Sequence, residues 1–488
     1  MQNTKRLPRS RPEAEGVSPS AVLAFLDAVE REKLELHSFM LLRRGRVVSE
    51  GWWAPYGPGE PHILNSLSKS FTATAIGIAA EEGLLSTEDI VASYFPEASD
   101  AASLPYVNEM RIRHLLTMSS GHAQDTLETL LRRRSGDWAR AFLETPLAYP
   151  PGVQFVYNSG ATYMLSAILR KATGQSLIEY LTPRLFGPLG IEGVLWETCP
   201  DGVEVGGWGM RATTEQIAKF GQLYLQRGMW GGRRLLSEAW VREATADLIS
   251  NGDDAANDWH QGYGFQFWRC RHGAYRGDGA FGQFCVVLEP FDAVLAITAG
   301  TGDMQGILSL VWTRLLPGLQ EDAAEDDAAY AALLRRQAEL AIPAVAGDAD
   351  SATARRVSGN VYELEDNGFG LRHAAFRFID DRAMIALTGG GEPIVLRCGY
   401  GEWLESRIER GGFAEPVWAR GGWRPDGAFA MTICWTRTPF VDEATCRFEG
   451  DRVVWSAVRN VGETIISTSL FFPSLAGTRV LRAPEGAC

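Results

Sequence analysis

The chain has 488 residues, 45% of them hydrophobic, and a formal net charge of −13, a composition typical of globular proteins with ample apolar material for a core. Because this length exceeds that at which a single core usually stops growing, we expect two domains. The acidic balance argues against a nucleic-acid partner, which needs a basic surface; the basic triplet 132–134 is typical of a solvated helix face.

Cysteine spacing and hydropathy exclude further classes of protein. The seven cysteines are widely spaced and form no C-x-x-C, so neither a disulfide framework nor a zinc site is predicted. Residues 1–16 are polar and lack the apolar stretch of a signal peptide, and no run reaches the roughly 18 apolar residues that span a membrane. We therefore expect a reduced, cytoplasmic protein without a membrane partner. Its oligomeric state stays open.

The first predicted elements are a helix and a β-hairpin. Apolar residues recur at helical spacing over 21–29, and β-like runs at 38–42 and 46–52 flank a short turn. A helical, loop-rich stretch follows from Ser66 to about Arg227. Strand-like segments then return at 263–268, 273–275, 283–288 and 293–298, before a final helix at 307–316.

This order predicts an α/β (α+β) domain over residues 1–318. Strands from both ends of the segment complete one antiparallel sheet flanked by helices, and an α-rich lobe is inserted between them. Beyond it, residues 319–356 are predicted to form an acidic helical connector and linker. Residues 357–488 contain short alternating runs with turn signals, which predict a smaller all-β domain, either a sandwich or a barrel.

The strongest local chemical signal is the S-x-x-K sequence formed by Ser66 and Lys69. Asn65 is predicted to cap a helix over 66–82 that ends before Gly83. The serine and the lysine, three residues apart, then share one helix face, so that the amine can reach the hydroxyl. Free N–H groups in the first turn favour a developing oxyanion, and a desolvated lysine can act as a base.

Four further segments follow the S-x-x-K in order. In this sequence they are R-I-R-H-L-L-T-M-S-S-G (111–121), P-G-V-Q-F-V-Y-N-S-G (151–160), G-M-R-A-T-T (209–214) and G-A-F-G-Q (279–283). Taken together, the segments resemble the successive signatures of the serine β-lactamase and penicillin-binding protein superfamily. The resemblance is strongest to the class C-like branch, which includes carboxylesterases, D-aminopeptidases and nylon-oligomer hydrolases, and it covers roughly residues 10–318. It implies a transpeptidase-like fold with the active site in the groove between sheet and helical lobe.

The resemblance also implies roles for individual residues. Ser66 matches the acylated nucleophile, Lys69 its basic partner, and Tyr157 the tyrosine that passes a proton to the leaving group. Either Lys69 or Tyr157 could be the immediate base. The second motif normally has Asn at the position of Ser159, and here Asn158 precedes that position. An exchange of the two residues would let the Asn158 amide contact the substrate, and this alternative stays open.

The third motif departs from the family pattern. Aligned on Gly282 and Gln283, it puts Ala280 where a Lys or His normally stands, so the cation that would hold a substrate carboxylate is missing. The backbone N–H groups of Gln283 and Ser66 are the expected oxyanion hole. The remaining predicted substrate contacts are Phe281 and Asp278; the latter either attracts a substrate ammonium group or simply forms a turn. Arg211 or Arg276 are the alternatives for the missing cation.

These residues predict a serine hydrolase that acts on small neutral esters or amides, with weak or no β-lactamase activity. The mechanism requires neither a metal nor an organic cofactor. The alternative is a non-catalytic binding protein that keeps the penicillin-recognising fold, an interpretation favoured by the altered second and third motifs.

Overall fold

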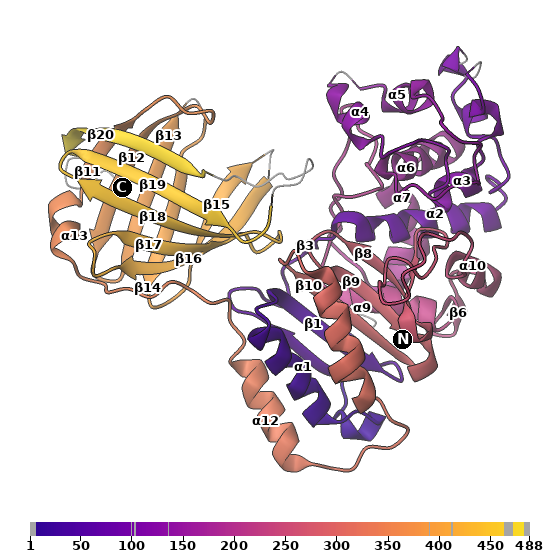
Figure 1. The fold of residues 1–488 in the computed structure, drawn as a ribbon, viewed down its shortest axis with the longest axis horizontal. Helices are drawn as coiled ribbons and strands as arrows, with labels where there is room; N and C mark the ends of the chain where they lie inside the picture. Colours follow the sequence, from indigo (N-terminus) through magenta and orange to yellow (C-terminus); the bar gives the residue numbers. More distant parts are fainter. Residues whose placement is uncertain are drawn as a thin grey trace. The chain divides into compact units, whose positions relative to one another are not determined.

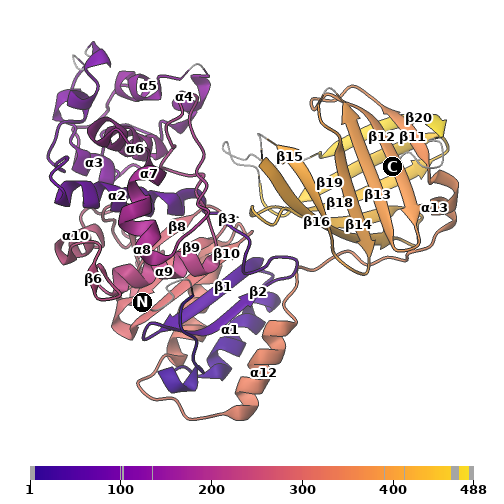
Figure 2. The same cartoon turned by 180° about the vertical axis from the view of Figure 1, so that it is seen from behind.

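The computed structural model describes residues 6–98, 100–101, 104–134, 136–389, 391–410, 413–462 and 472–482. The chain divides into two compact units whose segments alternate along the sequence. The first unit contains 1–51, 61–299 and 303–339, and the second contains 52–60, 300–302 and 340–488. Each unit is described by itself (Figures 1 and 2).

The first unit is built on a six-stranded sheet in the order β2-β1-β10-β9-β8-β7, antiparallel from β1 to β7. The strands are β1 (Leu36–Arg43), β2 (Arg46–Trp52), β7 (Trp268–Arg269), β8 (Tyr275–Gly279), β9 (Gln283–Leu288) and β10 (Ala293–Ala299). Strands β1, β8, β9 and β10 are buried along their whole length, so apolar residues face helices on both sides. As predicted, strands from both ends of the segment complete one sheet.

Helices cover both faces of this sheet (Figures 1 and 2). On one face α1 (Pro19–Arg31) packs against α12 (Asp327–Ala338) and the helical turn Val311–Leu315 that continues α11 (Met304–Leu310). On the other, α9 (Thr214–Leu225) packs on β9 and β10 through Gly221, where a Cβ would come 2.6 Å from Val294 and 2.8 Å from Cys285. Glycine at this position therefore permits the close approach of helix and sheet.

The helical lobe surrounds α2 (Ser68–Glu81) and α6 (Ser159–Thr173), which pack against each other. The other short elements of this unit are α3 (Ile112–Leu116), α4 (Leu127–Arg132), α5 (Trp138–Glu144), α7 (Leu177–Leu181), α8 (Gly187–Leu189), α10 (Glu238–Ala244), β3 (His62–Ile63), β4 (Arg211–Ala212), β5 (Met229–Trp230) and β6 (Arg233–Arg234). Nearly all of α2 is buried, which places its first turn at the centre of the unit.

The second unit is a ten-stranded sheet that closes on itself. Its strands are β11 (Asn360–Leu364), β12 (Leu371–Ile379), β13 (Arg382–Gly389), β14 (Ile394–Tyr400), β15 (Leu404–Arg410), β16 (Phe413–Trp423), β17 (Phe429–Cys434), β18 (Val441–Glu449), β19 (Arg452–Arg459) and β20 (Ser474–Arg482). A parallel pairing joins β14, at one end of the sheet, to β16, the strand next to the other end. Phe376, Trp423 and Phe448 pack together in its interior, so the predicted all-β domain is barrel-like.

The segment between the two folds belongs to both units. Helix α12 lies on the first, where Arg336 pairs with Asp27 and Glu30 of α1. Helix α13 (Ala352–Val357) packs on β12 of the second. The domain limits 1–318, 319–356 and 357–488 stay predictions, to be compared with these packing partners.

Candidate active site

Ser66 lies in a tight turn immediately before α2. Residues Asn65–Leu67 form a 3-10 turn, and Asn65 adopts a left-handed conformation with φ 47°. The expected helix cap is absent at Asn65, whose side chain instead donates a 2.9 Å hydrogen bond to the carbonyl of Ala280. The turn that carries Ser66 is thereby tied to the hairpin between β8 and β9.

Lys69 projects from the first turn of α2 to Ser66. Its Nζ lies 3.0 Å from Ser66 Oγ, 3.3 Å from Ser159 Oγ and 2.7 Å from the carbonyl oxygen of Gly207. Only 2% of the residue is exposed. Burial lowers the pKa of Lys69 to about 8, although the carboxylates of Asp125 and Asp278 favour its charged form. Near pH 8 about half of these amines are therefore neutral and can accept a proton from Ser66.

Tyr157 closes the other side of the nucleophile. Its hydroxyl interacts with the Ser66 side chain, and its ring stacks on Trp268 at 5.4 Å and 21°. The Lys69 ammonium lies 4.9 Å from the centre of the same ring. Burial, with the nearby charge of Asp278, raises the pKa of Tyr157 above its ordinary value. The geometry thus brings together Ser66, Lys69 and Tyr157, and it favours a neutral phenol over a phenolate.

The two residues after Tyr157 point to different places. Ser159 Oγ contacts the lysine amine, so this residue lies in the site. Asn158 is fully buried and caps α6: its Oδ1 accepts from the N–H of Gly160 at 3.0 Å and from the N–H and hydroxyl of Thr126 at 3.1 and 2.8 Å. The Asn158 oxygen thus holds the helix end, while its amide nitrogen has no hydrogen-bond partner, and the swapped amide as a substrate contact stays a prediction.

Asp125 is a residue of the site that the sequence analysis missed. Its Oδ1 accepts a 2.8 Å hydrogen bond from the N–H of Ser159 and a 3.0 Å bond from the N–H of Leu127. The half-buried carboxylate also acts on the charge of Lys69. Its spacing to Leu127 is that of an ordinary local turn, which is why the sequence alone gave no signal of a role beside the nucleophile.

The β8–β9 hairpin runs directly past Ser66, and Gly279 approaches the nucleophile turn closely. A Cβ on Gly279 would overlap the Leu64 carbonyl oxygen and come 3.0 Å from the Ser66 nitrogen. The next residues, Ala280 and Phe281, are half-buried in the hairpin loop, and Gly282 follows with φ 96°. These contacts favour Gly279 as an alternative glycine of the third motif. In that alignment the motif's cation position, two residues earlier, is Gly277 rather than Ala280.

Gln283 begins β9 beneath this loop. Its side-chain amide donates to the carbonyls of Ala280 at 3.1 Å and Ala299 at 2.8 Å, and the residue is fully buried. Its side chain thus braces the hairpin. The N–H of Gln283 as an oxyanion donor stays a prediction, and the N–H of Ala280 is the alternative donor.

Asp278 and Arg276 form an ion pair on β8. Asp278 Oδ2 lies 3.0 Å from the Arg276 Nε and 2.9 Å from Nη2, and both residues are buried. Burial raises the pKa of Asp278, while the Arg276 charge opposes this rise. Asp278 is therefore not a simple turn residue. Because Arg276 compensates its charge, it is also not a free anion that could attract a substrate ammonium group. The other alternative cation, Arg211, pairs with Ile63 in the β3–β4 ladder.

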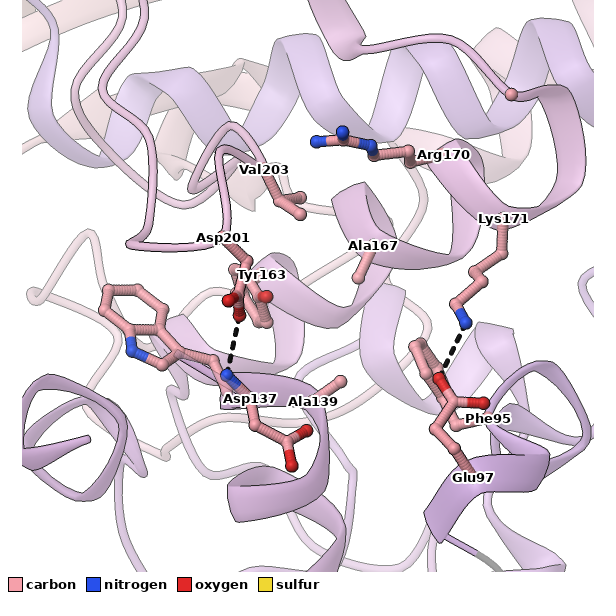
Figure 3. A pocket seen from close by; sticks show the side chains of 12 residues that line it. Phe95, Glu97, Asp137, Ala139, Tyr163, Ala167, Arg170, Lys171, Asp201 and Val203 are labelled. Carbon is pink, nitrogen blue, oxygen red and sulfur yellow. Dashed lines mark hydrogen bonds and ion pairs between the residues drawn. The ribbon is translucent and has the colours of Figure 1, made fainter. Parts of the chain in front are cut away.

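A cavity of about 510 Å³ in the helical lobe is separate from this constellation (Figure 3). None of Ser66, Lys69 and Tyr157 lines it. Lys171 pairs with Glu97 at 2.6 Å, and Asp201 accepts the N–H of Asp137 at 2.6 Å, so these polar groups have partners within the protein (Figure 3). The cavity therefore adds nothing to the candidate site.

Comparison with known proteins agrees with this geometry. The Beta-lactamase family model matches residues 24–303, more than half of the chain. The chain belongs to the beta-lactamase family. This match includes every residue of the candidate site.

Two of the relatives of this chain are hydrolases by name. The 6-aminohexanoate-dimer hydrolase of Paenarthrobacter ureafaciens is 28% identical over 222 residues, which cover 43% of this chain and 57% of that protein. The lovastatin esterase of Penicillium rubens is 27% identical over 150 residues, 26% of this chain and 37% of the esterase. The matches thus span about half the length of these curated relatives, or less.

Solved structures agree on the fold. A crystal structure from Bacteroides dorei, named as a candidate β-lactamase, matches with TM-score 0.51 at 17% identity and covers 60% of this chain and 98% of its own. SurE matches with TM-score 0.50 at 18% identity, covering 86% of this chain and 97% of its own.

Within the described ranges, no helix is both long and apolar enough to cross a bilayer.

Proposed function

We propose that the protein is a serine hydrolase that forms an acyl-enzyme at Ser66 and acts on small neutral esters or amides. The observation that carries this proposal is the 3.0 Å separation between Ser66 Oγ and the buried Lys69 Nζ, whose pKa is lowered to about 8. A buried amine in contact with a serine hydroxyl is the arrangement that activates a weak nucleophile.

In the acylation step, neutral Lys69 takes the proton as Ser66 Oγ bonds to the substrate carbonyl carbon. The oxyanion receives hydrogen bonds from the N–H of Ser66 and from a hairpin N–H. The approach of Gly279 favours Ala280 as this second donor, with the predicted Gln283 as the alternative. The loss of one such donor typically costs about 3 kcal/mol of transition-state stabilisation.

The leaving group then departs with a proton. Tyr157, a neutral phenol whose hydroxyl interacts with Ser66, can supply this proton and regain one from Lys69. Water attacks the acyl carbon in the second half-reaction, with the same groups exchanging the proton in reverse. Acid and alcohol, or acid and amine, leave, and Ser66 is restored.

The names of the relatives support the substrate class. One is named for an amide-bonded dimer and another as an esterase, so both bond types are reasonable for this chain. The third-motif strand carries no cation at Gly277 or Ala280 to compensate a substrate carboxylate. A neutral substrate loses nothing there, whereas a carboxylate must shed water without a partner.

Turnover of p-nitrophenyl butyrate and nitrocefin by the wild-type protein and the Ser66→Ala variant tests the proposal. We expect ester hydrolysis with a much larger kcat/KM than nitrocefin hydrolysis, and a loss of about 10³-fold or more in Ser66→Ala. Efficient nitrocefin hydrolysis would contradict the substrate class. A complete lack of turnover and of acylation would favour the alternative of a non-catalytic binding protein.

A further inference from the structure

Strand β8, which borders the nucleophile turn, carries the buried cation Arg276. The nearby carboxylate of Asp278 neutralises its charge. Arg276 and Asp278 are two residues apart on β8 and therefore point to the same face of the sheet. The next residue, Gly279, approaches the nitrogen of Ser66. This ion pair thus lies one residue from the point where Gly279 approaches the nucleophile turn.

The surroundings of Arg276 leave Asp278 as its ion-pair partner. The Arg276 Nη1 donates to the carbonyl of Asp258 at 2.9 Å and to Cys270 Sγ at 3.0 Å, while Nε and Nη2 face Asp278. The Asp258 carboxylate is occupied by Arg271, Gln305 and Trp312. Nε of this fully buried guanidinium donates to Asp278, whereas Nη2 lies 2.9 Å from the same carboxylate oxygen without making a hydrogen bond.

Aromatic rings connect this pair with the catalytic residues. The guanidinium carbon of Arg276 lies 4.4 Å from the ring centre of Trp259 and 5.7 Å from that of Trp268. Trp268 in turn stacks on Tyr157. A buried guanidinium beside aromatic rings, with one donor bonded to a carboxylate and a second donor left without a hydrogen bond, is suited to binding a carboxylate.

We propose that Asp278 determines specificity by occupying, with its own carboxylate, an anion-binding position that Arg276 forms beside the nucleophile. The inference rests on the proposed function and deepens it, because it explains why substrates with a carboxylate at this position are excluded. Such a substrate meets the charge of Asp278 and no available cation. A neutral group meets a compensated pair.

The proposal makes an unusual prediction for variants without this carboxylate. Truncating one partner of a buried ion pair leaves the other charge uncompensated, which is strongly destabilising. A small carboxylate that enters the vacated space would restore the pair, and ligand binding to the folded state would raise its stability by mass action. External anions should thus rescue an Asp278 variant and leave the wild-type protein unaffected.

The first experiment measures the thermal unfolding midpoint of Asp278→Ser in sodium formate, with sodium chloride at equal ionic strength as reference. We expect a lower Tm than wild type in chloride and a saturable rise in formate that is absent from the double variant R276Q/D278S. The matched control is Asp426→Ser, which breaks an exposed ion pair with Arg447 in the barrel-like unit. An identical response of Asp278→Ser and R276Q/D278S to formate would overturn the proposal.

The second experiment compares 3-(butyryloxy)benzoate with its methyl ester as substrates of Asp278→Asn, which keeps the side-chain shape, and of Asp278→Ser where it folds. We expect the ratio of kcat/KM for the carboxylate over the methyl ester to rise at least 10-fold above the wild-type ratio. An unchanged ratio in an active Asp278→Asn enzyme would overturn the inference. Formate rescue needs no catalysis, so a failure of the proposed hydrolase function leaves the first experiment decisive.

Discussion

At the residue scale, the site depends on the protonation states that burial favours for Lys69 and Tyr157. Burial disfavours the ammonium of Lys69 and the phenolate of Tyr157, so both groups are driven to their neutral forms. The sequence left open whether Lys69 or Tyr157 is the base. A neutral amine beside a serine hydroxyl can take its proton, whereas a neutral phenol can only give one, which favours Lys69 as the base.

This assignment predicts the pH dependence of the reaction. Because the base must be neutral, kcat/KM for p-nitrophenyl butyrate should rise with pH and level off above the lowered pKa of Lys69, about 8. Tyr157→Phe should reduce the plateau and keep a midpoint governed by Lys69. A rate that falls as pH increases from 6 to 9 would contradict a lysine base.

Asp125 gives a second prediction at this scale. Its carboxylate favours the charged form of Lys69, so Asp125→Asn should lower the pKa of Lys69 further. The amide oxygen can still accept the N–H of Ser159, which keeps the turn in place. We expect the midpoint of the kcat/KM profile to move to lower pH with little change in thermal stability. A midpoint that moves to higher pH would exclude this electrostatic role.

At the element scale, the geometry of the β8–β9 hairpin decides how the third motif is aligned. The sequence identified the helix after Ser66, its end before Gly83 and the tyrosine segment, because helix periodicity and motif spacing are local signals. It aligned the third motif on Gly282, but Gly279, three residues earlier, fits the pattern as well. Only the contact of Gly279 with the nucleophile turn separates them. Asn65 was likewise expected to cap a helix and instead bonds across to Ala280.

The close approach at Gly279 predicts a sharp response to a single methyl group. Gly279→Ala would push a Cβ into the Leu64 carbonyl and toward the Ser66 nitrogen, so the turn must shift. We expect at least about 10²-fold loss in kcat/KM, since small displacements of reacting groups are costly. Gly59→Ala, at a position with open space around it, is the control and should retain activity. Full activity in Gly279→Ala would refute this packing.

At the scale of the whole molecule, the composition and strand patterns predicted an α+β fold and an all-β fold, and both are present. The sequence could not reveal that short segments of the first region, 52–60 and 300–302, pack with the barrel-like unit. Such pairings join residues that are distant along the chain, so no local pattern encodes them. For example, Glu60 pairs with Arg437 at 3.2 Å.

This arrangement predicts the behaviour of a truncated chain. A protein that ends at residue 339 keeps every residue of the candidate site but loses the partners of 52–60. We expect it to unfold at a lower temperature and still to be acylated at Ser66 wherever circular dichroism shows it folded. A folded truncated protein that resists acylation would mean that the barrel-like unit is needed for the chemistry.

The central claim is covalent catalysis by Ser66, and the most direct test is the intact mass of the protein after treatment with a fluorophosphonate. We predict one adduct per chain, mapped by peptide sequencing to Ser66, formed faster as the pH rises through about 8 as Lys69 becomes neutral. Ser66→Ala should remain unmodified, and Lys69→Met should react far more slowly. An adduct at another residue, or equal labelling of Ser66→Ala, would contradict the account.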